Sequence, residues 1–245
     1  SIHKLFSDPS AAEISGGKFL FNGRSSALQI SLTQEMRSYF ISSGNNQAKR
    51  GFGGFIKFTL LQDPSVGEQI LVDAGDWFQI KVTTAGTVSY TSKANRALLD
   101  ADLPYVQTTV VSQHATSAAL VVGTEYIVFF GIMPGAVFGV ADAATLRVDT
   151  TSAVGTLDYH TFFSSDYHPP ILDYSDEPKI YVGAEADETA STNLSAAVSR
   201  FALYRTWIGE DINVNRESIV YLTGEDFKDK TTQNVGVVPV IHSSI

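Results

Sequence analysis

The chain of 245 residues contains no cysteine. Disulfide bonds, thiol nucleophiles and thiolate metal sites are therefore excluded. The absence of cysteine does not exclude a large extracellular domain, because a core of this size is stable without disulfide bonds.

Basic residues are scarce as well. Seventeen Lys and Arg stand against 26 Asp and Glu, which gives a formal net charge of −9. A surplus of negative charge repels phosphate backbones and anionic membrane surfaces. Nucleic acid is therefore not expected as a partner.

Long apolar runs are missing too, since no stretch approaches the ~18 residues that a membrane-spanning helix needs. The longest candidate, Tyr126 to Val140, is interrupted by glycine and proline, which predicts strand, turn, strand. We expect no membrane insertion. Residues Ser1 to Pro9 lack the basic and apolar segments of a signal peptide, although a signal removed ahead of residue 1 would leave no trace.

Several catalytic motifs are also lacking. The chain has no Gly-x-Ser-x-Gly elbow, and its five histidines form no His-x-x-x-His pair. The glycine-rich segment Ser42 to Gly54 carries Lys49 and Arg50 but no Gly-Lys-Ser/Thr ending, so it does not predict a phosphate-binding loop. We interpret it as a flexible loop.

Short runs of alternating apolar residues are what the sequence does contain. In Trp77 to Val82, the side chains of Phe78, Ile80 and Val82 fall on one side of a period-two ribbon and the intervening ones on the other. This is the pattern of a half-buried strand. Hydrophobic residues make up 44% of the chain, enough for a sizeable core.

The same rhythm recurs along the chain, with Gly, Asn, Asp, Ser and Pro in the gaps, and predicts an all-β, two-sheet antiparallel sandwich. We expect a single domain over residues 1–245, with a core at about 15–225 and extensions at both ends. A helical stripe in Asn213 to Leu222, followed by Gly224, predicts one short C-terminal helix. The predicted strands are 18–21, 27–32, 55–61, 69–72, 77–82, 87–91, 105–111, 125–132, 145–148, 179–182 and 198–204.

The gap Thr156 to Lys179 holds repeated Asp-Tyr pairs, two of them followed by His. Aromatic faces stack on the apolar face of a sugar ring, while neighbouring polar groups bind its hydroxyls. A packing role is the alternative, with the tyrosines over the sandwich edge and the histidines bracing Pro169 and Pro170. The candidate ligand-binding residues are Tyr159, His160, Tyr167, His168 and Tyr174.

Acidic residues greatly outnumber the single basic residue, Lys179, between Asp158 and Glu188. Closely spaced carboxylates repel unless a cation separates them, and calcium prefers oxygen ligands. Asp158, Asp166 and Asp187 are therefore candidate calcium ligands. A solvated acidic loop without any ion is the alternative, because the stretch has no fixed ligand register.

Catalysis on a sandwich of this kind would need two carboxyl groups across a sugar-sized cleft. Glu185 and Asp187 come nearest, because they would share a face if their segment were a strand. The segment reads more like a turn, and position 190 is alanine where the laminarinase-type Glu-x-Asp-x-x-Glu pattern has glutamate. We expect no enzyme.

The predicted strands follow one another in an order that resembles that of laminin-G-like, concanavalin A-like jelly rolls over roughly residues 15 to 225. Tyr126 stands where that family commonly has Trp, and Asp149 is followed by Thr150 where Gly is usual. The resemblance implies surface recognition of glycans or adhesion partners, or decoration of a larger assembly such as a virus or phage particle. The matching segments are 54–59, 70–80, 87–90, 123–128, 145–149, 180–183 and 199–205.

The leading hypothesis is a non-catalytic, lectin-like protein outside the cell or on a virion surface. In one form it binds a glycan; in the other it attaches to capsid or tail proteins, and the isolated protein forms a homo-oligomer or docks a capsid. The alternatives are a polysaccharide-degrading hydrolase or lyase of the same fold and a calcium-dependent adhesion module.

Overall fold

The computed structural model describes residues 10–32, 52–75, 78–96, 106–114, 119–133, 143–161, 179–186, 193–204, 207 and 218–241. Strands dominate these residues, and a 3-10 turn, η2 (Pro64–Val66), follows β4. The strands are β1 (Glu13–Ser15), β2 (Lys18–Asn22), β3 (Ser26–Ser31), β4 (Phe52–Leu60), β5 (Gln69–Asp73), β6 (Phe78–Val82), β7 (Val88–Arg96), β8 (Val106–His114), β9 (Glu125–Met133), β10 (Ala143–Thr150), β11 (Asp158–Thr161), β12 (Lys179–Val182), β13 (Ser195–Tyr204), β14 (Ser218–Thr223) and β15 (Gly236–Ile241).

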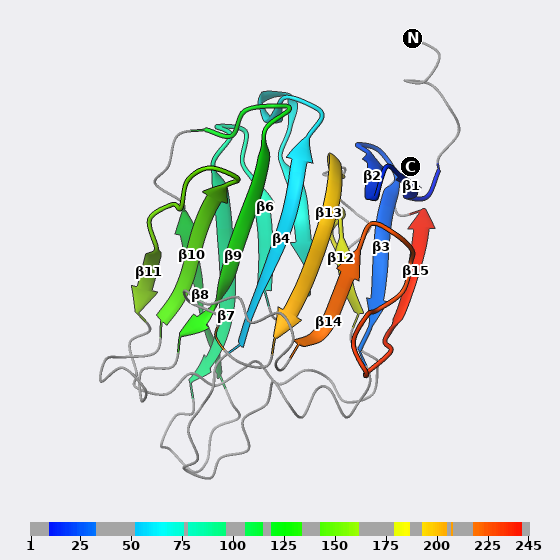
Figure 1. Cartoon of the computed structure of the whole chain (residues 1–245). Helices are drawn as coiled ribbons and strands as arrows, with labels where there is room; N and C mark the ends of the chain where they lie inside the picture. Colours follow the sequence, from blue (N-terminus) through cyan, green and yellow to red (C-terminus); the bar gives the residue numbers. More distant parts are fainter. Residues whose placement is uncertain are drawn as a thin grey trace.

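Two stacked antiparallel sheets make up the described part of the chain (Figure 1). Sheet A has eight strands in the order β1-β2-β13-β4-β9-β10-β11, with β14 pairing the free half of β13. Sheet B has seven strands in the order β15-β3-β12-β5-β6-β7-β8. Sheet A faces the viewer in Figure 1 and sheet B lies behind it. The predicted all-β, two-sheet sandwich is confirmed.

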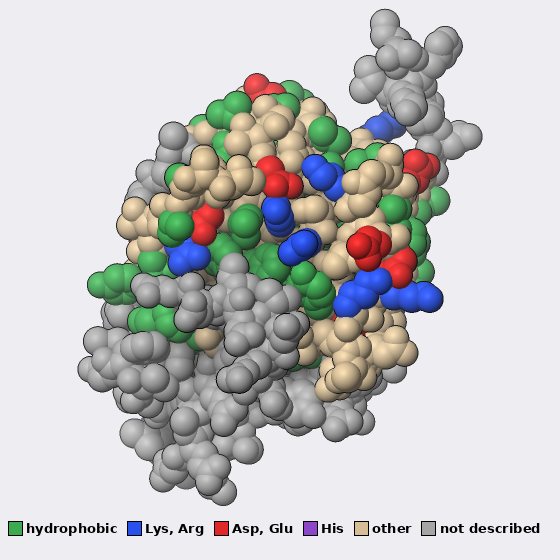
Figure 2. Space-filling view, viewed as in Figure 1, with side chains coloured by type: hydrophobic (Ala, Val, Ile, Leu, Met, Phe, Trp, Pro, Cys, Tyr) green, Lys and Arg blue, Asp and Glu red, His purple; other side chains and the backbone are tan. Residues whose placement is uncertain are grey.

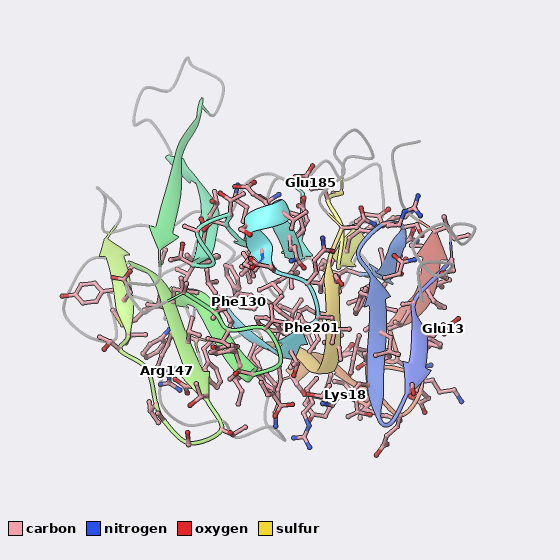
Figure 3. All side chains as sticks on the ribbon, turned by 90° about the horizontal axis from the view of Figure 1, so that it is seen from above. Glu13, Lys18, Phe130, Arg147, Glu185 and Phe201 are labelled. Carbon is pink, nitrogen blue, oxygen red and sulfur yellow. The ribbon has the colours of Figure 1, made fainter. Side chains whose placement is uncertain are left out.

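The core lies between the sheets and follows the predicted alternation. On β6, Phe78, Ile80 and Val82 are buried, while Gln79 and Lys81 are partly exposed. The Phe130 ring of sheet A lies 5.2 Å from that of Phe78 and 5.9 Å from that of Tyr90, both in sheet B. Figure 3 shows Phe130 and Phe201 in the layer between the sheets. Aromatic contacts therefore join the two sheets at the centre.

The predicted helix at Asn213 to Leu222 is wrong where the structure describes it. Residues 218–222 belong to strand β14, and residues 213–217 lie outside the described ranges. Pairing with β13 sets Val220 opposite Leu203 and Leu222 opposite Phe201, all buried. Gly224 donates its N–H to the Ser199 carbonyl, which continues the strand pairing. A short apolar run fits both periods, and here tertiary pairing decides between them.

Within the described ranges, no helix is long and apolar enough to cross a membrane.

Candidate functional site

The face of sheet A that points away from sheet B carries a second hydrophobic cluster. The outer face of an antiparallel sheet is usually polar, because water covers it. Here Phe55, Phe129, Ala202 and Tyr204 form a buried cluster of their own, with Ile127 and Tyr221 packed against it. Such a face is available for recognition wherever it is open.

One row of residues crosses this outer face from edge to centre. Tyr159, Thr145, Gly131, Gly53 and Tyr204 lie directly opposite one another on β11, β10, β9, β4 and β13. Directly opposed residues point to the same face. The middle of the row carries no side chain, and a Cβ at Gly131 would lie 2.3 Å from the Phe52 carbonyl oxygen. The row therefore has an aromatic ring at each end and glycine in the middle, and of its five residues Tyr159 is the exposed one while the other four are buried.

Thr145 holds the indole of Trp207 on this row. The Thr145 hydroxyl accepts a hydrogen bond from Trp207 Nε1 at 2.9 Å and donates to the Gly131 carbonyl at 3.3 Å. Tyr159, opposite Thr145 on the edge strand, is 61% exposed. Thr145 itself is 2% exposed, so exposed Tyr159 and partly exposed Trp207 are the side chains here that a flat, partly apolar ligand can contact.

A buried ion pair stabilises the hairpin that presents Tyr159. Arg147 Nε lies 3.0 Å from Asp149 Oδ1, and both side chains are about nine-tenths buried. The guanidinium lies 4.6 Å from the centre of the Phe129 ring, and Asp149 Oδ1 also accepts the Gly155 N–H at 2.8 Å. The turn between β10 and β11 is therefore fixed to the sheet, and with it the register of Tyr159. Figure 3 shows Arg147 on the outer side of β10.

The Tyr204 hydroxyl is buried, and no described residue makes a hydrogen bond with it. Burial, with a smaller contribution from Tyr221, raises the pKa of Tyr204 from 10.0 to about 12. A raised pKa on a phenol means that the folded protein favours the neutral form.

Tyr204 is therefore expected to ionise only near pH 12 in the folded protein. The unfolded chain ionises this phenol near pH 10, so its contribution to stability is complete below pH 10 and is lost as the pH rises toward 12. When phenolate absorbance is followed as the pH is raised, wild type should show a component that ionises near pH 12, and this component should be missing in Tyr204→Phe. If both proteins give the same curve, the Tyr204 hydroxyl is not shielded from water.

The predicted ligand and metal residues divide into described and undescribed ones. Tyr159 lies on the outer face, whereas Asp158 is opposite buried Leu146 and so points to the other side of β11. His160 follows in the same strand, and its side chain is outside the described part. Tyr167, His168, Tyr174, Asp166 and Asp187 also lie outside the described ranges. Within those ranges no three His, Asp or Glu side chains gather to hold a metal, and calcium stays a prediction.

Glu185, the described member of the candidate carboxyl pair, lies outside any strand, in a bend after β12. Asp73 fixes this bend, because its Oδ2 accepts the Ala186 N–H at 3.1 Å and the Gln79 side-chain amide at 3.0 Å. Its other oxygen accepts the Gly75 N–H at 2.7 Å. The expectation of a turn at Glu185 is confirmed. Asp187 is not described, so the pair itself is untested.

Sequence reasoning missed Thr145, Arg147 and Trp207 as site residues. Thr145 and Arg147 alternate along the predicted strand 145–148, and Asp149 follows it in the same period, so this polar side was the available signal. Trp207 is separated from Thr145 by 62 positions, and no local pattern links them.

Comparison with known proteins finds similarity in structure alone. No protein-family model and no curated protein sequence matches the chain. Domains LG4-5 of the mouse laminin α1 chain align with a TM-score of 0.50 at 10% identity, over 96% of this chain and 50% of theirs. The botulinum neurotoxin serotype D/C binding domain gives 0.50 at 8% identity, over 83% and 44%. A proposed carbohydrate-binding protein from Bacteroides ovatus gives 0.49 at 9% identity, over 94% and 59%.

The similarities to the laminin and toxin domains establish the fold. The predicted resemblance to laminin-G-like jelly rolls is confirmed at the level of the fold. The chain spans between about two fifths and three fifths of the length of these solved structures.

Proposed function

We propose that this protein is a non-catalytic, lectin-like recognition protein that binds a glycan on the outer face of sheet A. The observation that carries the proposal is the pair of aromatic side chains next to buried Thr145, namely exposed Tyr159 and partly exposed Trp207. Sugars bind to partly exposed aromatic rings beside fixed polar groups, since a ring accepts the apolar sugar face and the polar groups fix its orientation.

The rigidity of this region supports the proposal. Thr145 is the third residue of the eight-residue strand β10, and the Arg147–Asp149 pair with Gly155 fixes the hairpin beside it. Sites on regular elements are held more closely than sites on free loops, which lowers the ordering cost of binding. The fold is also one in which binding domains occur, the toxin domain among them. Fold alone does not assign a ligand.

Tyr159→Ala is expected to weaken glycan binding by about tenfold, because it removes one of the two aromatic contacts. The melting temperature should change little, since the side chain is 61% exposed. The measurement is binding of wild type and variant to an array of neutral and acidic glycans, followed by calorimetry on the best ligand. Trp207→Phe, which keeps a ring but loses the N–H to Thr145, should weaken binding less than Tyr159→Ala.

Tyr181→Ala is the matched control. Tyr181 is a partly exposed tyrosine on β12 in sheet B, and its ring faces away from sheet A. Its removal should leave binding unchanged. Equal loss in Tyr159→Ala and Tyr181→Ala, or no loss in either, would place the ligand elsewhere.

Display outside the cell or on a virion surface is part of this proposal, and attachment to capsid or tail proteins is its alternative form. That form requires that no array glycan binds and that the isolated protein oligomerises or docks a particle. The enzyme alternative requires release of reducing ends or unsaturated products from a polysaccharide that stops in Glu185→Gln. Incubation with laminarin, agarose, carrageenan and alginate tests it.

A further inference from the structure

The upper part of the same outer face carries a row of cations on three neighbouring strands. Lys18 on β2, Arg200 on β13 and Lys57 on β4 all lie on this face, and we call them the cationic row. Figure 2 shows basic and acidic side chains gathered there, above a green hydrophobic area. Figure 3 shows Lys18 on the outer side of sheet A, as it shows Arg147.

One carboxylate, that of Glu125, forms ion pairs with two cations of this row. Glu125 on β9 lies 3.2 Å from Lys57 Nζ through Oε1 and 3.9 Å from Lys18 Nζ through Oε2. Arg200 is exposed and forms no ion pair within the described part of the chain. Among the described residues, Glu125 is the one carboxylate in an ion pair with this row, in a chain whose net charge is −9.

The arrangement runs against the usual rule for sheets. Arg200 lies directly opposite Lys57, and like charges in that position destabilise a sheet. A register shift between Val198 and Arg200 brings this about, because it accommodates Ser199 as an extra residue and sets Arg200 on the face of Lys57. Local conflicts of this kind are expected at functional sites.

The neighbours of the row indicate what kind of anion fits. Ile127, opposite Lys57, and Tyr221, opposite Ala202 in the next row, are partly buried apolar side chains of the same face. Exposed Glu225 also lies near the row, because it follows Gly224, whose N–H bonds the Ser199 carbonyl and where a Cβ would lie 2.4 Å from Lys18 Cα. Asp226 is paired with Lys230. Asp149 is paired with Arg147, and Glu13 lies on edge strand β1.

We infer that the glycan of the proposed function is acidic, and that its carboxylate or sulfate groups bind the cationic row while sugar rings contact Ile127 and Tyr221. This inference rests on the proposed function. Thr145 and Lys57 are four residues and two strands apart across the face, about 16 Å at ordinary strand spacing. An extended polysaccharide can reach both places; a single sugar cannot. A chain of net charge −9 is a poor binder of the dense phosphates of nucleic acid.

The test compares alginate and dextran sulfate with neutral dextran, using the full chain and the double variant Lys57→Gln/Arg200→Gln. Wild type should bind at least one acidic polymer and not dextran, with affinity that falls as salt rises. The affinity of the double variant for that acidic polymer should be about tenfold lower than that of wild type, since the variant lacks two charge-assisted contacts. Lys81→Gln/Lys179→Gln makes the same charge change on sheet B and should change affinity less than about twofold.

The outcomes separate this inference from the proposed function. Neutral glycans that bind in a Tyr159-dependent way, with no gain from acid groups, would overturn the acidic ligand and leave the proposed function standing. Equal losses in both double variants would also overturn it, because they indicate general charge attraction. Binding of a DNA duplex as tight as that of the acidic polymers would overturn it in favour of phosphate. If no polymer or array glycan binds, both fail.

Discussion

Phe130→Ala is expected to lower the free energy of unfolding by about 3–5 kcal/mol. Phe130 is 2% exposed, and its ring contacts Phe78 and Tyr90 of the opposite sheet. Truncation removes buried apolar area and leaves a cavity that two rigid sheets cannot close. Urea or guanidinium unfolding measures the change, with the slope of the transition compared between variants.

Val66→Ala is the control for that measurement. Val66 is 72% exposed in η2, so its truncation should stay within about 0.5 kcal/mol of wild type. A loss of less than about 1 kcal/mol in Phe130→Ala, which is ordinary for any point mutation, would contradict the assigned packing between the sheets.

Asp229→Ala is expected to destabilise the protein by about 3 kcal/mol, because each buried donor left without a partner costs about 1–3 kcal/mol. Asp229 is buried between β14 and β15. Its Oδ1 accepts the N–H groups of Tyr221 and Thr231 at 3.0 Å each. Its Oδ2 accepts the Val235 N–H at 3.0 Å and the Thr231 hydroxyl at 2.6 Å.

Asp226→Ala is the matched control three residues earlier. Asp226 accepts from Lys230 Nζ at 2.8 Å and from the Lys228 N–H at 3.1 Å. A hydrogen bond from Lys230 lowers the pKa of Asp226, but the carboxylate lies in solvent, which screens the interaction. The unfolding midpoint should move little. Similar shifts in the two variants would contradict the organising role of Asp229.

Much of the fold is predictable because burial of one sheet face imposes period two on the sequence. β6 shows this clearly, since Phe78, Ile80 and Val82 alternate with Gln79 and Lys81. β11 was not predicted, because Asp158, Tyr159, His160 and Thr161 carry no apolar alternation. This edge strand exists through its pairing with β10, which a local pattern does not contain.

The sequence predicted one residue of the candidate site, Tyr159, but not the residues that lie around it. Tyr159 was identified from its place in an aromatic, polar segment. Trp207 meets Thr145 through a contact between distant parts of the chain. Arg200 meets Lys57 only because a bulge shifts the register of β13, and no single-sequence pattern fixes the register of a bulged strand.

The central claim is that the glycan lies on the outer face of sheet A. Backbone amide chemical-shift mapping during titration with an acidic oligosaccharide tests it most directly. The account predicts shifts that concentrate at Lys57, Thr145, Tyr159 and Arg200, with sheet B unchanged. Shifts confined to the sandwich end formed by residues 62–68 and 119–124, with sheet A silent, would contradict it.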